Sequence, residues 1–111
     1  MTILKRGMVI DVNLNPTKGS ETGKVRPCVI VTHNIYNERV PLAAWSEKKG
    51  RIKTNVVITP DSQNGLSKMS VADCLQTRPI DHRYRLVRVR GKLTAKTMKQ
   101  INQALKVIFA L

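Results

Sequence analysis

Arg26 occupies the position in this sequence that best suits chemistry on a phosphate group. Gly19 and Gly23 permit backbone conformations that other residues resist, so we expect the segment between them to be a loop. Pro27 favours an extended backbone at Arg26, and the apolar run Cys28–Val31 predicts a buried strand. Arg26 therefore stands where a loop meets a rigid strand, and its planar guanidinium can pair with two phosphate oxygens at once.

Other polar residues of the same loop could act together with Arg26. Glu21 could accept a proton or hold Arg26 in place, and the alternative is a solvated loop carboxylate. Lys18 and Ser20 could bind phosphate through an ammonium and a hydroxyl group, although Ser20 could instead stabilise a local turn. Lys24 adds a further cation for binding, two residues before Arg26.

The charge balance favours a polyanionic partner. Lysine and arginine total 20 residues against 7 of aspartate and glutamate, which gives a net charge of +13 and a pI near 10.5. Nucleic acid is the foremost candidate, and a basic surface that merely aids solubility is the alternative. A membrane surface is disfavoured, because the sequence has no basic amphipathic helix with aromatic anchors.

No metal ion, cofactor or disulfide is expected. His33 and His82 have no partners at metal-ligand spacing, and the seven carboxylates are scattered. Cys28 and Cys74 lie in apolar runs outside any C-x-x-C pattern, so both should be reduced core residues of a cytoplasmic protein. The sequence shows no signal peptide or long apolar span, so it does not support secretion or membrane insertion.

Six short strands are predicted from hydrophobic patterns and turn residues, at Met8–Leu14, Cys28–Thr32, Val40–Trp45, Asn55–Thr59, Ser70–Gln76 and Leu86–Arg90. The first strand alternates from Ile10 onward, which places Asp11 on the face opposite the apolar residues. In the sixth strand, alternation places Arg88 and Arg90 on the solvent side. The residues around His82 predict a turn without a functional role.

The C-terminal segment predicts one amphipathic helix. Thr94 can cap it, and Met98, Ile101, Leu105 and Ile108 recur at steps of three and four residues. No other long helical pattern is present. Residues 1–111 should therefore form a single, mainly β domain, in which a small, strongly bent sheet or barrel of five to six strands is closed by a C-terminal helix.

Residues outside the first loop could also contribute to nucleic-acid binding. Trp45, the only tryptophan, could stack on an unpaired base, and the alternative is a buried position in the core or at a dimer interface. The charged connection Ser46–Lys53, which includes Lys49, could face phosphate groups or form a solvated hairpin tip. Arg78 is a further cation that would attract RNA.

Three longer motifs follow one another along the chain. They are R-G-M-V (Arg6–Val9), P-T-K-G-S-E (Pro16–Glu21) and R-P-C-V-I-V (Arg26–Val31). Shorter matches lie at Asn34–Asn37, Gly65–Leu66, Ser70–Val71 and Gln76–Asp81. Together these motifs closely resemble the MazF/PemK family of bacterial toxins, and the resemblance spans nearly the whole chain. The members of this family are metal-independent endoribonucleases that cut single-stranded RNA.

The resemblance implies a fold, an assembly and a reaction. The fold would be an SH3-like, CcdB-like barrel in a two-fold homodimer. Arg26 would be catalytic in a sequence-selective cleavage of mRNA, in which the 2′-hydroxyl attacks the adjacent phosphate and leaves a 2′,3′-cyclic phosphate and a 5′-hydroxyl. The second partner would be an acidic antitoxin that lays a disordered segment over the basic groove.

The third strand departs from the family pattern. Many members carry a catalytic threonine, or threonine and serine, where this sequence has Ala43 and Ala44. Ser46 lies two residues further on and would share a strand face with Ala44, so Ser46 is the candidate catalytic hydroxyl if the strand continues. The alternative function is a catalytically weak or inactive barrel that binds RNA, or a CcdB-like barrel that binds a protein target.

Overall fold

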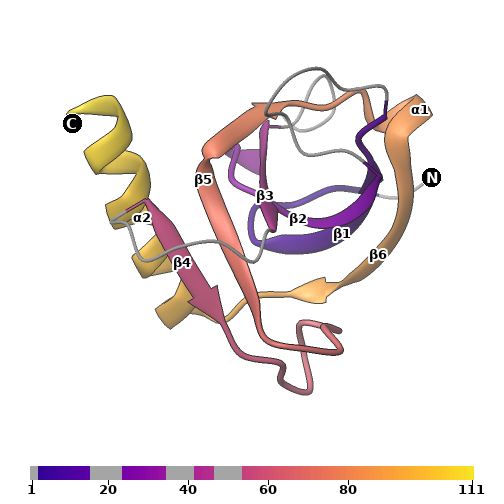
Figure 1. The fold of residues 1–111 in the computed structure, drawn as a ribbon, viewed down its shortest axis with the longest axis horizontal. Coiled ribbons are helices and arrows are strands. Elements are labelled where there is room, and N and C mark those ends of the chain that lie inside the picture. The colour runs from indigo at the N-terminus through magenta and orange to yellow at the C-terminus, as the bar shows by residue number, and fades with distance from the viewer. Residues whose placement is uncertain (1–2, 16–23, 35–41, 47–53) are drawn as a thin grey trace.

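Six strands and two helices make up the part of the chain that the structure describes (Figure 1). The computed structural model describes residues 3–15, 24–34, 42–46 and 54–111, and the side chains of these residues except Trp45 and Ser46. The elements in chain order are β1 (Met8–Asn13), β2 (Val25–Ile30), β3 (Leu42–Ser46), β4 (Asn55–Ile58), β5 (Ser70–Pro79), α1 (His82–Arg85), β6 (Leu86–Lys92) and α2 (Ala95–Phe109).

The six strands form one sheet with the order β4-β5-β3-β2-β1-β6, and every neighbouring pair is antiparallel. The sheet curls strongly, so that Figure 1 looks into a small barrel with β1, β2, β3, β5 and β6 around it. Helix α2 lies outside this ring and packs beside β4 and β5. The prediction of a mainly β barrel of five to six strands with a C-terminal helix is confirmed.

The predicted strands are all present, with shifted ends. β2 occupies Val25–Ile30 instead of Cys28–Thr32, so Arg26 lies inside a strand rather than ahead of it. β5 and β6 run on beyond their predicted ends, while β1 and β4 each stop one residue earlier. β3 continues to Ser46, and the first two residues predicted for it, 40 and 41, lie outside the described residues.

The sheet buries apolar side chains on both of its faces. The face that α2 covers holds a cluster that includes Val9, Val29, Ala44, Ile101 and Ala104. The opposite face holds a second cluster, formed by Leu4, Ile10, Val12, Leu14, Cys28, Ile30, Ala43 and Ile80. Consecutive residues of one strand therefore enter different cores, as the alternation of side chains in a strand requires.

Helix α2 follows its prediction. The Oγ1 of Thr94 accepts a hydrogen bond of 3.3 Å from the backbone N–H of Thr97, which caps the helix. Ile101 and Ala104 are buried against the sheet, and the remaining apolar residues of the helix stripe pack partly against the same cluster.

Helix α1 is absent from the prediction, which placed only a turn there. His82–Arg85 form a single helical turn between β5 and β6. Asp81 caps this turn, because its Oδ1 accepts the N–H of Arg83 at 3.2 Å and its carbonyl accepts the N–H of Arg85 at 2.9 Å. The segment is too short to show a helical period, so the sequence carries no periodic signal for it.

Asp11, which the alternation of β1 places on the face opposite Ile10 and Val12, is buried although it carries a charge. Asp11 is 4% exposed, and two arginines of the neighbouring strand β6 enclose its carboxylate. Arg88 Nε donates to Oδ2 and Arg90 Nε donates to Oδ1, each at 2.6 Å. Arg88 stays largely exposed, whereas Arg90 is mostly buried and also donates to the carbonyl of Gly65 at 2.9 Å. The carboxylate can be buried because these partners, far along the chain, compensate its charge.

Candidate functional site

Arg26 lies in β2, opposite Val12 of β1, and its side chain is exposed. Alternate residues of a strand point to the same face, so Arg26 shares the face of Cys28 and Ile30, which is opposite the face that α2 covers. The apolar cluster on this face includes Cys28 and Ile30 but not Arg26. The strand therefore presents the guanidinium to solvent at the edge of a rigid core.

Arg78 lies on the same face of the sheet. It pairs with Ala43 of β3, which in turn pairs with Ile30 of β2, and directly opposed side chains share a face. Burial, and after it the negative charge of Asp11, raise the pKa of the nearby Cys28 thiol to about 12, and the positive charge of Arg78 acts in the opposite direction. Two arginines from β2 and β5, Arg26 and Arg78, thus flank one face.

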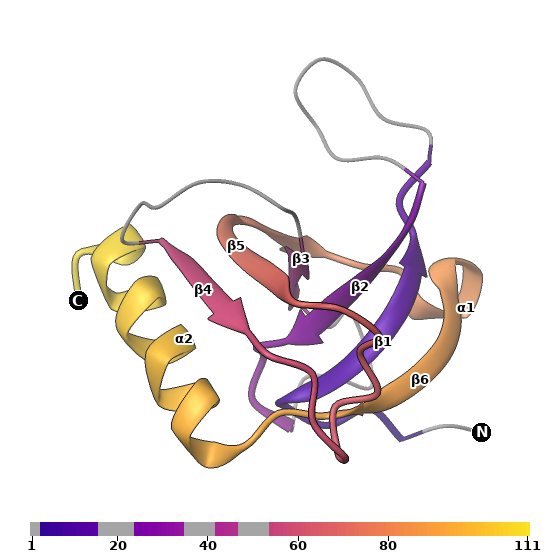
Figure 2. The same cartoon turned by 60° about the horizontal axis from the view of Figure 1, so that its bottom comes forward.

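Lys24 closes the base of the segment that precedes Arg26. Its backbone has φ 66°, in the left-handed region that residues with a Cβ adopt at a cost. The N–H of Lys24 donates to Asn15 Oδ1 at 3.0 Å, and its carbonyl accepts the N–H of Leu14 at 2.9 Å. These bonds join the two ends of residues 16–23. We call Asn13–Asn15 together with Lys24 the stem. Figure 2 shows β1 and β2 running side by side up to it.

Arg85 of α1 contacts the same stem. Its Nη1 donates to the carbonyl of Asn13 at 2.9 Å and to the carbonyl of Asn15 at 2.8 Å. The sequence carries no signal for this contact, because α1 and β1 are about seventy residues apart and no local motif links them. The stem is thus held by a side chain from another part of the fold.

Three residues predicted to act with Arg26 lie in the segment that the stem closes. Lys18, Ser20 and Glu21 are outside the described residues, and so is Lys49. Their roles therefore remain predictions.

The position of β3 bears on the catalytic hydroxyl that the family pattern places where this chain has Ala43 and Ala44. Ala43 and Ala44 are completely buried, one in each core, so neither position could present a side chain to a ligand in solvent. The pairing of β3 with β5 is irregular between Ala43 and Trp45, and β3 then continues to Ser46, opposite Ala72. β3 therefore extends as far as Ser46, which is the condition under which Ser46 could supply the catalytic hydroxyl. The catalytic role of Ser46 and the stacking role of Trp45 remain predictions.

The carboxylates of the described residues are engaged in structural hydrogen bonds. Asp11 accepts from two arginines, and Asp61 Oδ1 accepts two backbone N–H groups at 2.8 Å. Asp73 Oδ1 accepts the N–H of Leu75 at 3.2 Å, and Asp81 caps α1. Within the described ranges, each aspartate side chain therefore accepts a hydrogen bond that stabilises the fold, while Glu21, the proton acceptor proposed from the sequence, lies outside these ranges.

The two cysteines are free and buried, as predicted. Burial raises the pKa of Cys28 to about 12 and that of Cys74 to about 11, so neither thiol ionises readily at neutral pH. Among the described residues, no three histidine, cysteine or carboxylate side chains gather where they could hold a metal ion. The helices of the described chain are too short or too polar to cross a membrane.

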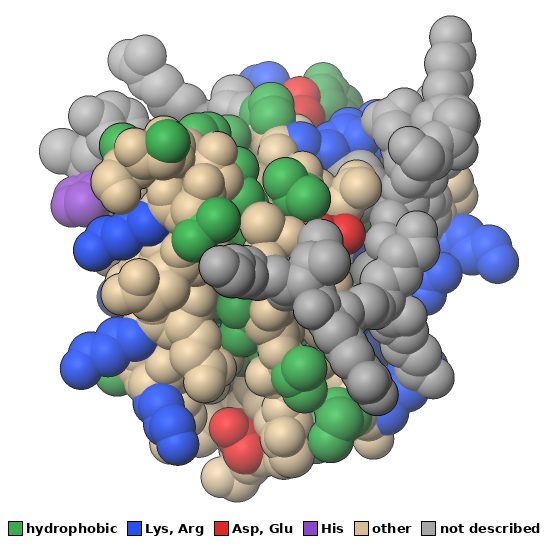
Figure 3. Space-filling model, turned by 60° about the vertical axis from the view of Figure 1, so that its left-hand side comes forward, with side chains coloured by type: hydrophobic (Ala, Val, Ile, Leu, Met, Phe, Trp, Pro, Cys, Tyr) green, Lys and Arg blue, Asp and Glu red, His purple; other side chains and the backbone are tan. Residues whose placement is uncertain are grey.

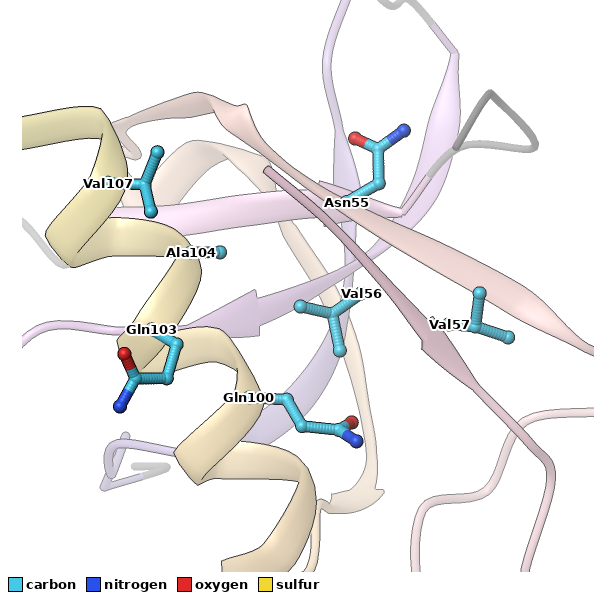
Figure 4. Close-up of a pocket in the computed structure, with 7 residues that line it drawn as sticks. All are labelled: Asn55, Val56, Val57, Gln100, Gln103, Ala104 and Val107. Carbon is cyan, nitrogen blue, oxygen red and sulfur yellow. The ribbon is translucent and has the colours of Figure 1, made fainter. Parts of the chain in front are cut away.

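A second surface lies on the other side of the molecule, between β4 and α2. It is a groove of about 500 Å³ lined by Asn55, Val56, Val57, Gln100, Gln103, Ala104 and Val107. Figure 4 shows Ala104 and Val107 across the groove from Val56. No charged residue occurs among the described residues of its lining. In Figure 3, hydrophobic side chains gather along the middle of this side, with lysines and arginines towards its margin.

Comparisons with known proteins agree with the motifs. A family model described as a PemK-like, MazF-like toxin of type II toxin-antitoxin systems matches residues 5–109. The endoribonuclease MazF of Staphylococcus saprophyticus is 36% identical over 114 residues, which cover 98% of this chain and 93% of that protein.

Solved structures share the fold. MazF from Deinococcus radiodurans has a TM-score of 0.82 at 20% identity and covers 100% of both chains. A MazE–MazF structure from the same organism has a TM-score of 0.75 at 20% identity and covers 100% of this chain and 99% of that chain.

Proposed function

The chain belongs to the PemK-like, MazF-like toxin family of type II toxin–antitoxin systems, and from this premise we propose how its residues cut RNA. The protein is an endoribonuclease and the toxin of its pair. Its substrate is single-stranded RNA, including mRNA, and its action is sequence-selective. The proposed site is the face of the sheet that carries Arg26 and Arg78, and the proposed location is the cytoplasm.

The exposed guanidinium of Arg26 is the observation that carries this proposal. It projects from a rigid strand, on the same face as Arg78 and two residues after Lys24. A site that stabilises a dianionic phosphorane needs fixed donors aimed at the phosphate, and a planar guanidinium on a strand supplies two of them. Lys24, with Lys18, Ser20 and Lys49, adds binding groups for the neighbouring phosphates.

The reaction requires one bond to form and one to break. The 2′-oxygen attacks the adjacent phosphorus while its proton moves to a base, for which we propose the Glu21 carboxylate. The bond from phosphorus to the 5′-oxygen then breaks, and the departing oxygen takes up a proton from water. Arg26 stabilises the charge on the phosphorane, and the hydroxyl of Ser46 donates a hydrogen bond to it. The products are a 2′,3′-cyclic phosphate and a 5′-hydroxyl, and no step requires a metal ion.

Charge also selects the macromolecular partner. A protein of net charge +13 attracts an acidic antitoxin segment to the surface that attracts RNA. The antitoxin would therefore compete with RNA, and its association would slow as salt increases.

The protein forms a homodimer, and we assign the contact between copies to the uncharged groove between β4 and α2. Two copies of a chain with net charge +13 repel each other, so their contact is favoured where cations are absent. The described lining of the groove meets this condition, and Val57 and Val107, which belong to it, are more than half exposed in the single chain. RNA or an acidic peptide would instead require cations in the lining.

The test is cleavage of a long, unstructured RNA by antitoxin-free protein in the presence of a chelator. We expect products with 2′,3′-cyclic phosphate and 5′-hydroxyl ends, and slower cleavage by Glu21→Gln and Ser46→Ala. RNA binding without cleavage would refute the enzymatic proposal and would leave the non-catalytic alternative. Products that carry 5′-phosphate ends would refute the proposed attack by the 2′-hydroxyl.

A further inference from the structure

The side chain of Arg85 joins helix α1 to the stem. We propose that Arg85 is a positioning residue: it fixes the stem and thereby the placement of Arg26 for RNA cleavage. This inference rests on the proposed function of Arg26. Arg85 does not need to touch RNA, since its two hydrogen bonds run to the carbonyls of Asn13 and Asn15 within the protein.

The two carbonyls that Arg85 binds lie where the strand pairing ends. β1 stops at Asn13, whose partner Val25 is the first residue of β2. Beyond this pair, one backbone bond joins the N–H of Leu14 to the carbonyl of Lys24, and the carbonyls of Asn13 and Asn15 are held by Arg85. One nitrogen of Arg85 bridges Asn13 and Asn15 and so fixes the direction in which the chain leaves the sheet.

A short series of bonds leads from Arg85 to Arg26. Asn15, held by Arg85 through its carbonyl, accepts the N–H of Lys24 through Oδ1 at 3.0 Å. Asn15 is itself oriented by Asn13, whose Oδ1 accepts the N–H of Asn15 at 3.0 Å. Lys24 has a left-handed backbone that only its surroundings can maintain, and it lies two residues before Arg26. A looser stem would therefore change the start of the strand that carries the guanidinium.

Arg85 can act as an anchor because its helix is fixed in turn. Asp81 caps α1, and the preceding residue Ile80 is completely buried in the core on the face of Arg26. The other arginine of this helix, Arg83, is an internal comparison. Its side chain is 73% exposed and pairs with Asp81 at 3.4 Å rather than with the stem. The two arginines thus carry the same charge on the same helix but differ in their contacts.

The experiment compares Arg85→Met, Arg85→Lys and Arg83→Met. Methionine keeps an unbranched, flexible stem but has no donor, whereas the lysine ammonium can still donate to both carbonyls. Misplacement of a catalytic group by about 1 Å can reduce a rate roughly 100-fold. We therefore expect Arg85→Met to lower kcat about 10- to 100-fold with little change in KM, Arg85→Lys to restore most of kcat, and Arg83→Met to leave kcat unchanged.

Amide hydrogen exchange gives a readout that does not depend on catalysis. The N–H groups of Leu14 and Lys24 close the stem, so in Arg85→Met both should exchange on the order of tenfold faster. In Arg83→Met their exchange should not change. Amides of buried strand residues such as Ile30 serve as the control for the integrity of the fold in each variant.

The outcomes separate this inference from the proposed function. Wild-type protein that does not cleave RNA refutes the proposed function, while the exchange data still test the contact with the stem. Faster exchange with unchanged kcat refutes a positioning role. A lower kcat without faster exchange, or a loss as large in Arg83→Met as in Arg85→Met, also refutes it, because the effect would then come from direct contact or from charge alone.

Discussion

The carboxylate of Asp11 offers a quantitative test of how the edge strand β6 is held to β1. It lies on β1, it is 4% exposed, and it joins β1 to β6 through Arg88 and Arg90 at 2.6 Å each. The change to consider is Asp11→Ala, together with Arg88→Ala and Arg90→Ala. Because the three side chains differ in exposure, the three losses of stability should differ in a defined order.

The magnitudes follow from exposure. The Arg88 side chain is 61% exposed, so its ion pair is screened by solvent and its loss should cost about 0.5 kcal/mol. The Arg90 side chain is 20% exposed and also binds the carbonyl of Gly65, so its removal should cost about 2 kcal/mol. Asp11→Ala leaves the mostly buried Arg90 without its carboxylate and should cost about 3 kcal/mol.

The assay is urea unfolding at one fixed protein concentration, because dimerisation contributes to the measured stability. With an m-value of about 2 kcal/mol per molar urea, Asp11→Ala should lower the midpoint by about 1.5 M. The expected order of loss is Asp11→Ala, then Arg90→Ala, then Arg88→Ala. An Arg88→Ala variant that loses as much stability as Arg90→Ala would refute this reasoning, as would an Asp11→Ala loss below about 1 kcal/mol.

Three further predictions concern other parts of the fold. Val107→Asp should weaken dimerisation on the order of 100-fold in sedimentation equilibrium without unfolding the chain, and an unchanged dimer would contradict the assigned interface. Because folding raises the pKa of Cys28 to about 12, the unfolded chain releases this proton first; the free energy of unfolding should therefore fall as pH rises from about 9 towards 12, and less steeply in Cys28→Ala. Equal slopes would count against this burial. Gly91→Ala should cost about 3 kcal/mol in thermal unfolding, because a Cβ at this position would meet the carbonyl of Gln63; a neutral effect would show that this approach is looser than described.

The pattern of apolar and polar residues predicted most of the helices and strands but not the contacts between them. The alternation from Ile10 and the three- and four-residue steps up to Ile108 report burial directly, so the strands and α2 could be read from the sequence. The burial of Asp11 could not be predicted because its partners lie on β6, and the pattern of one strand does not include the charges of another.

The candidate site was predictable to a similar degree. Arg26 became a candidate because Pro27 and the apolar residues after it predict a strand that follows a loop. Its relation to Arg78 depends on the register of β2, β3 and β5, which one sequence does not contain. Arg85 was missed for the same reason, since α1 is a single turn and its target carbonyls lie about seventy residues away.

The most direct test of the account is the single-turnover rate of RNA cleavage by Arg26→Ala, in the presence of a chelator and beside Arg83→Ala. Removing a preorganised donor from a developing oxyanion typically costs about 100- to 1,000-fold in rate. We predict a loss of that size for Arg26→Ala, with RNA affinity within about tenfold of wild type, and no loss for Arg83→Ala. Cleavage by Arg26→Ala within about threefold of the wild-type rate would contradict the account.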